Sequence, residues 1–161
     1  QMDFLTEFFK KAKAEGVHTN LDTSGNPFTD QEPWHSGWLE LMKYTDLVML
    51  DIKQIDEQEH IKLTGHSNKN ILAMARELSD MKKPVWIRHV LVPGGSDKDE
   101  YLHRLADFIH TLSNVERVEV LPYHTLGKFK WENLGLSYPL EGVNPPTQER
   151  IDNARKILGA I

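Results

Sequence analysis

The chain has 161 residues, of which 39% are apolar and 27% are charged, and its formal net charge is −5. This length and composition fit one globular domain with a hydrophobic core and exclude a disordered or fibrous protein. The absence of cysteine excludes disulfides, a cysteine nucleophile and any thiolate-ligated zinc or iron–sulfur centre within these residues. The mild acidity provides no basic face, so we expect no nucleic-acid partner.

The sequence carries no signal for a membrane or for secretion. No stretch approaches the roughly 20 apolar residues that span a bilayer, and the first residues lack the basic and apolar regions of a signal peptide. We therefore expect a cytoplasmic protein without a membrane partner. The chain begins at Gln1 in a pattern that is already helical, which suggests a fragment of a longer protein.

Hydrophobic periodicity divides the chain into alternating helices and strands. Residues 3–15 repeat apolar side chains at helical spacing, residues 17–22 form a short strand, and a turn cluster follows at 23–27. Residues 46–52 are a near-continuous apolar run, which is typical of a strand buried on both faces. The other expected elements are helices at 33–43, 56–64, 68–81, 98–112 and 148–159, and strands at 85–93 and 115–122.

This alternation predicts an α/β fold with a parallel sheet. We expect Asn68 to cap the helix that follows it, and Ser96 or Asp97 to cap the helix at 98–112. The stretch 123–146 is rich in aromatic residues, glycine and proline, and we expect it to be irregular.

Polar side chains gather on the predicted strands, mostly where the strands end. Asp22 ends the first strand, Asp51 and Lys53 follow the second, Arg88 lies within the third, and His124 follows the fourth. Ligand sites of parallel α/β folds lie at the carboxyl ends of the strands. Because charge is disfavoured on buried strands, these side chains are expected to be either paired or functional.

Each of these residues also has a purely structural explanation. Asp22 could form only an Asx-turn, Asp51 and Lys53 could pair with each other, and Arg88 could be the counter-ion of Asp51. We expect His89, on the opposite face from Arg88, to pack in the core, and a lone histidine such as His124 is more often structural. The other histidines lack ligand spacing and are assigned to the surface or core, and two tryptophans are assigned to the core: His18, His35, His60, His66, His103, His110, Trp34 and Trp38.

Several of these segments together resemble the pyruvate formate-lyase activating enzymes, a family of radical S-adenosylmethionine (SAM) proteins that activate glycyl radical enzymes. The resemblance covers nearly the whole chain, through GVNPP at 142–146. Its motifs are HTNLDTSG (18–25), TDLVMLDIKQ (45–54), VWIRHVLVPGGSD (85–97) and VLPYHTLGKFKW (120–131).

The resemblance implies a partial (β/α)6 TIM-like radical SAM barrel. Residues 1–161 would form its C-terminal four βα units, as part of a single domain. The N-terminal part would be absent from this chain. In the family that part holds the CxxxCxxC motif that ligates a [4Fe-4S] cluster and the Gly-Gly-Glu segment that holds the SAM amino group.

The resemblance also implies roles for individual residues. Asp51, Ile52 and Lys53 match a DLK segment that contacts SAM, with isoleucine in place of leucine, and His124 matches a histidine that lines the same site. The positions that hold a monovalent cation are matched by Asp22, Thr23, Met49 and Asp51, with Met49 offering its backbone carbonyl. Arg88 matches a strand arginine that faces the cavity and is a candidate substrate contact. No residue of this chain is assigned as catalytic, and Asn20 stands where the family often has cysteine.

The activity implied is SAM-dependent formation of a glycyl radical on pyruvate formate-lyase, a step of anaerobic glucose metabolism. The cofactors would be SAM, a [4Fe-4S] cluster and a monovalent cation, and the electron donor would be flavodoxin-type. The fragment alone is expected to be inactive. Two alternatives remain: an aldolase-like barrel lyase that uses Lys53 as a Schiff base beside Asp51 and Asp22, and a binding module without a cluster.

Overall fold

The computed structural model describes residues 1–160. At its centre is a four-stranded sheet in the order β1-β2-β3-β4, with every neighbouring pair parallel. The predicted α/β class and parallel sheet are confirmed. The strands are β1 (Asn20–Thr23), β2 (Leu47–Asp51), β3 (Val85–Leu91) and β4 (Val115–Pro122).

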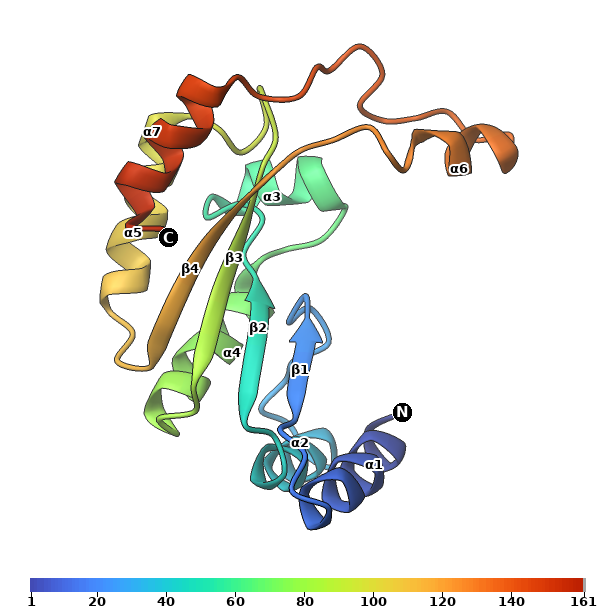
Figure 1. Cartoon of the computed structure of the whole chain (residues 1–161), viewed down its shortest axis with the longest axis vertical. Helices are drawn as coiled ribbons and strands as arrows, with labels where there is room; N and C mark the ends of the chain where they lie inside the picture. Colours follow the sequence, from blue (N-terminus) through green and yellow to red (C-terminus); the bar gives the residue numbers. More distant parts are fainter. Residues whose placement is uncertain (161) are drawn as a thin grey trace.

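The helices cover one side of the sheet and leave the other side open (Figure 1). Helices α4, α5 and α7 lie along the covered side, α1 and α2 pack together beside the start of β1, and α6 projects away from the sheet (Figure 1). The helices are α1 (Met2–Ala14), α2 (Trp34–Lys43), α3 (Glu57–Thr64), α4 (Lys69–Asp80), α5 (Asp99–His110), α6 (Lys128–Asn133) and α7 (Gln148–Leu158).

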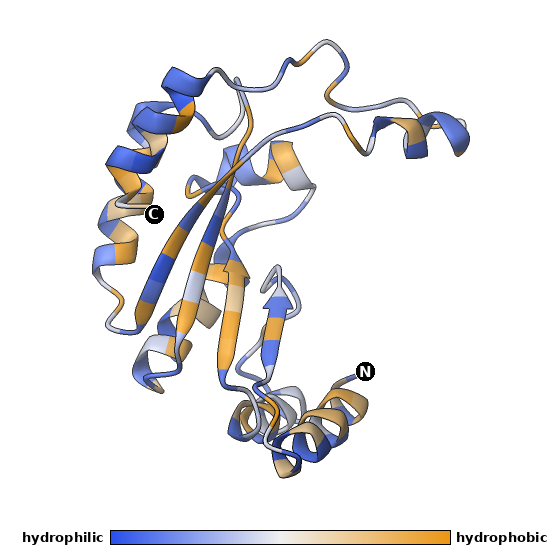
Figure 2. Cartoon of the chain, viewed as in Figure 1, coloured by the Kyte–Doolittle hydropathy of each residue, from blue (hydrophilic) through white to orange (hydrophobic). Residues whose placement is uncertain are grey.

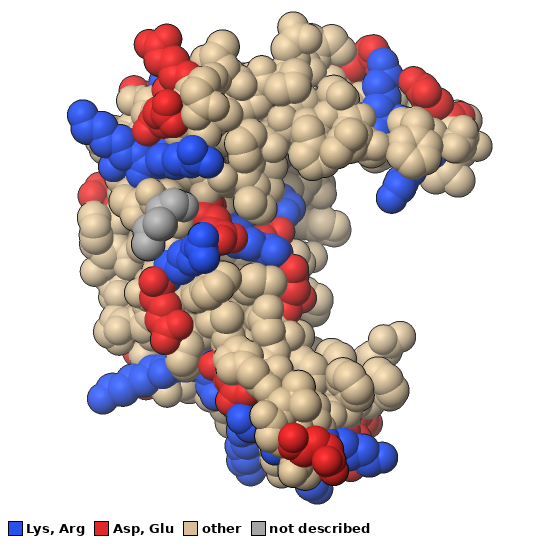
Figure 3. Space-filling model, viewed as in Figure 1, with Lys and Arg blue, Asp and Glu red and all other residues tan. Residues whose placement is uncertain are grey.

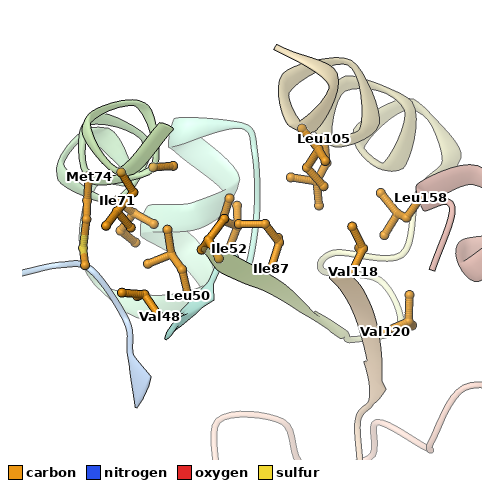
Figure 4. Close-up of a cluster of buried hydrophobic side chains, with 14 of the residues drawn as sticks. Val48, Leu50, Ile52, Ile71, Met74, Ile87, Leu105, Val118, Val120 and Leu158 are labelled. Atoms are coloured by element: carbon orange, nitrogen blue, oxygen red, sulfur yellow. The ribbon is translucent and has the colours of Figure 1, made fainter. Parts of the chain in front are cut away.

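The core lies between the sheet and its covering helices (Figure 4). Side chains alternate across a strand, and in β3 every second residue from Val85 to Leu91 is buried. Strand β2 is apolar along most of its length, whereas β1 and β4 alternate with polar residues (Figure 2). The core contributors include Val48, Leu50, Ile87, Val118, Val120, Ile71, Met74, Leu105 and Leu158.

Asn68 occupies the N-cap position of α4, as expected, but without a capping hydrogen bond, and the prediction that Ser96 or Asp97 caps α5 is wrong. The Asn68 amide donates to the carbonyls of Gln54 and Ile55 and makes no cap bond to α4. Helix α5 begins after Lys98 without a side-chain cap. Ser96 instead donates to the Val90 carbonyl and accepts from the Val92 amide, which closes the loop after β3.

Two further segments, the stretch 123–146 and helix α1, also differ from expectation. The stretch expected to be irregular contains α6, whose preceding turn is closed by a bond from the Lys128 amide to the Thr125 carbonyl. On α1, Phe9 is buried but Phe4 and Phe8 are 67% and 55% exposed, so only part of the predicted apolar stripe packs against the described residues.

The cap of α7 gives a direct test of local helix stability. The Thr147 hydroxyl oxygen accepts a hydrogen bond from the Arg150 amide. Thr147→Ala is expected to lower the free energy of unfolding by about 1 kcal/mol, because that amide loses its acceptor. Thr147→Ser keeps the oxygen and should stay near the wild-type value. Urea unfolding would measure both, and an equal loss in the two variants would contradict this account of the cap.

Candidate functional site

Arg88, in the middle of β3, reaches the ends of β1 and β2. Its Nε donates to Asp51 Oδ1 at 2.7 Å, its Nη1 donates to Asp22 Oδ2 at 2.8 Å, and its Nη2 donates to the other Asp22 oxygen. The Lys53 ammonium donates to Asp51 Oδ2 at 2.7 Å. The two carboxylates and two cations therefore form one continuous ion-pair network, in which Asp51 bridges Lys53 and Arg88.

The sheet register brings these side chains to one face. Asp51 pairs with Arg88 across β2 and β3, and Asp22 pairs with Met49 across β1 and β2. Because paired residues of adjacent strands point the same way and residues two apart share a face, Asp22, Met49, Asp51 and Arg88 all lie on the open face. Charged side chains of both signs meet in the hollow of the C-shaped molecule (Figure 3).

The environment of Arg88 favours its charged form. Burial opposes the charge, but the hydrogen bonds and charges of Asp22 and Asp51 outweigh burial and raise the pKa of the guanidinium. The Arg88 and Asp51 side chains are 17% and 16% exposed, whereas Asp22 is 55% exposed. Arg88 and Asp51 thus form the protected part of the network, and Asp22 forms its solvent-facing end.

Two of the structural explanations offered for these side chains are correct as geometry, whereas the Asp22 carboxylate pairs with Arg88 instead of closing an Asx-turn. Asp51 does pair with Lys53, and Arg88 is the counter-ion of Asp51. Asp51 and Lys53 nevertheless border a cavity, so these two members of the network face a space that a ligand can enter.

The structure does not bring every predicted site residue into this network. Ile52 is fully buried in the core, its amide donates to the Arg88 carbonyl, and its carbonyl faces His89. The Thr23 hydroxyl, on the covered face, accepts from the Gly25 amide. His124 follows β4 with an exposed side chain, and its Nδ1 accepts from the Leu126 amide at 3.4 Å.

His89 is buried, as expected, and it joins two loops of the site. Its Nδ1 lies 2.9 Å from the Ile52 carbonyl, and its Nε2 lies 3.2 Å from the Ser96 carbonyl. Burial lowers the pKa of His89, which favours the neutral ring. His89 therefore connects the Asp51–Lys53 segment to the loop after β3 from the covered side of the sheet.

Sequence reasoning missed a cavity beside Asp51 and Lys53, with a volume of about 120 Å³. Its walls come from the loop after β1, the end of β2, helix α3 with the loop that follows it, and the start of α4. No motif links these positions, because only the tertiary fold brings them together. Besides Asp51 and Lys53, the lining residues are Ser24, Asn26, His60, Thr64, His66 and Ile71.

Within residues 1–160, no group of three or more histidine, aspartate or glutamate side chains is arranged to hold a metal ion. Of the positions matched to a cation site, Asp22 and Asp51 are both occupied by Arg88. In the same described range, no helix has the length and apolarity needed to cross a membrane.

Curated relatives match almost the whole chain. The pyruvate formate-lyase-activating enzyme of Streptococcus mutans is 56% identical over 158 residues, which cover 98% of this chain and 60% of that protein. The enzymes of the same name from Staphylococcus epidermidis and Staphylococcus aureus are 56% and 53% identical, with 98% of this chain and 63% of each relative covered. The chain thus spans 60–63% of the length of these relatives. No protein-family model matches.

Solved structures support the same fold. A domain of a pyruvate-formate lyase-activating enzyme from Bacteroides vulgatus superposes with a TM-score of 0.78 at 22% identity, over 98% of this chain and 85% of that one. A radical SAM methyltransferase from Sphaerobacter thermophilus gives a TM-score of 0.60 at 18% identity, over 90% of this chain and 39% of that one. These likenesses establish the fold, which is consistent with part of a TIM-like barrel. The sequence identity, which spans 60–63% of the length of these relatives, makes the chain a homologue of that part of the pyruvate formate-lyase-activating enzymes.

Proposed function

We propose that residues 1–161 are the C-terminal part of a single radical SAM barrel in a cytoplasmic activating enzyme. The complete enzyme would use a [4Fe-4S] cluster and SAM to generate a glycyl radical on pyruvate formate-lyase, with electrons from a flavodoxin-type donor. The observation that carries this proposal is the 56% identity over 98% of the chain to curated activating enzymes. Because the chain contains no cysteine, the cluster ligands would come from outside these residues.

The network at the strand ends fits the amino-acid portion of SAM. Lys53 supplies a cation for a carboxylate, and Asp51 supplies an anion for an ammonium or sulfonium group. Both side chains border the cavity at the end of β2. Bound SAM would supply the 5′-deoxyadenosyl radical, and the residues of this chain would bind and orient it.

The other predicted residues would act around this pair. Ile52 would hold Asp51 and Lys53 in place from the core, since its side chain is fully buried, and His124 would reach the ligand from the loop after β4. A monovalent cation would be held by carboxylate and backbone carbonyl oxygens of Asp22, Thr23, Met49 and Asp51, in place of the contacts that the two aspartates make with Arg88. Arg88 would contact the glycyl radical enzyme from the open face.

The decisive experiment uses the longer protein that contains this chain. After anaerobic reconstitution with iron and sulfide, we expect cluster absorbance, reductive cleavage of SAM and a glycyl radical signal in the electron paramagnetic resonance spectrum of pyruvate formate-lyase. Absence of SAM cleavage by a protein that carries an intact cluster would refute the proposal.

Lys53 offers a test of the residues themselves. Lys53→Met in the reconstituted protein is expected to weaken SAM binding about 10-fold or more, because a charged hydrogen bond contributes about 1.5–3 kcal/mol. Lys62→Met removes an exposed lysine that pairs with Glu59 on α3 and should leave SAM affinity unchanged. Isothermal titration calorimetry with SAM would measure both variants, and equal affinities would exclude Lys53 from the site.

A further inference from the structure

His60 is a buried residue with an unused hydrogen-bonding atom beside the proposed SAM site. Its side chain lies on α3 and is only 2% exposed. It lines the cavity of about 120 Å³ that also borders Asp51 and Lys53. Among the described residues, its Nε2 is buried without a hydrogen-bond partner, an arrangement that costs free energy unless a donor fills it.

The local structure fixes the orientation and tautomer of the ring. His60 Nδ1 lies 2.7 Å from the His66 carbonyl, and because a carbonyl only accepts, Nδ1 carries the proton and donates it. The Thr64 hydroxyl donates to the His60 carbonyl at 2.8 Å. In the neutral ring Nε2 is therefore an acceptor.

Lys53 has more hydrogen-bond donors than its one partner, Asp51, uses. An ammonium group has three N–H donors, and one of them goes to Asp51 Oδ2. Lys53 and His60 line the same cavity, which is large enough to hold a water molecule. The cavity is thus lined by Lys53, whose ammonium has unused N–H donors, and by His60, whose buried Nε2 lacks a donor.

We propose that His60 is a positioning residue that accepts an N–H of Lys53 at Nε2, directly or through one water molecule in the cavity. Asp51 and His60 would then hold the Lys53 ammonium between them and fix its direction toward the ligand. This role rests on the proposed function of Lys53 in SAM binding, but the proposed hydrogen-bonded link does not require bound SAM.

Nuclear magnetic resonance can test the link without SAM. In the full chain labelled with 15N-histidine at neutral pH, the His60 Nε2 resonance should show a hydrogen-bonded lone pair. In Lys53→Met it should move by several ppm or more toward the value of a free lone pair, whereas Lys62→Met should not move it. An unchanged Nε2 resonance in Lys53→Met would overturn the proposal.

Two substitutions at position 60 separate positioning from folding. His60→Asn can keep a donor near the His66 carbonyl but is too short to replace Nε2, whereas His60→Gln can place an oxygen near the Nε2 position. In the reconstituted longer protein, we expect His60→Asn to raise the Kd for SAM about 5-fold or more and His60→Gln to stay within about 2-fold. Equal effects of the two variants would overturn the positioning role. Failure of the wild-type protein to bind SAM would instead refute the proposed function and leave the His60–Lys53 link to the resonance measurement.

Discussion

Arg88→Met is expected to lower the free energy of unfolding by about 2 kcal/mol. The substitution leaves Asp22 and Asp51 without their shared counter-ion at the ends of adjacent strands. Removing one partner of a buried ion pair typically costs 3–5 kcal/mol, and the solvent exposure of Asp22 at 55% reduces that cost. The urea midpoint should therefore fall at neutral pH, with the slope of the unfolding curve unchanged.

Two further variants test this explanation. Arg88→Lys keeps the charge but loses the planar fork that contacts both carboxylates, so it should recover only part of the stability. Asp51→Asn combined with Arg88→Met should cost less than the sum of the two single substitutions, because the second change removes the uncompensated carboxylate. Strict additivity would show that Asp51 and Arg88 are not energetically coupled.

His89→Leu is expected to lower stability at pH 8 by about 2 kcal/mol and to remove part of the pH dependence of folding. The neutral His89 ring donates to one of the two carbonyls that face it, from Ile52 or Ser96. Leucine removes that donor, and a buried carbonyl without a partner costs about 1–3 kcal/mol. Chemical denaturation measured between pH 8 and pH 5 would test both effects.

The sign of the pH effect follows from the lowered pKa of His89. Burial holds the folded-state pKa below the ordinary value of 6.5, so the unfolded chain binds a proton first as the pH falls. The contribution is fully present above pH 6.5 and is lost as the pH falls from there toward the folded-state pKa, with a slope of up to about 1.4 kcal/mol per pH unit. His89→Leu should flatten this slope.

His103→Gln, on the exposed face of α5, should keep the wild-type slope.

Asp46 affects stability in a separate pH range, because the hydrogen bond from Lys13 and then that from the Thr19 amide lower its pKa to about 2. The contribution of Asp46 to stability is present above pH 3.8 and is lost as the pH falls toward 2.

For His89→Leu, a slope between pH 6.5 and 5 equal to that of the wild type would show that another group causes the pH dependence.

The sequence alone predicted the four strands and their parallel arrangement, because the signals for the strands are local. The apolar run of β2 and the alternation of β3 mark buried strands, and the helices between them require parallel pairing. The positions of Asp22 and Asp51 at the ends of their strands, with Arg88 on the next strand, predicted that these side chains meet, since parallel strands place their carboxyl ends at one edge.

Other features depended on contacts between distant segments, which periodicity does not encode. The sequence pattern predicted a capping role for Asn68 and for Ser96 or Asp97, but tertiary contacts gave the Asn68 amide and the Ser96 hydroxyl different backbone partners. The pattern left Asp22 and Lys53 open to several roles, and the fold joined them through Asp51 and Arg88 into one network. His60 had no recognisable spacing, and only the tertiary fold brought its side chain, with the unpartnered nitrogen, to the cavity that Lys53 also lines.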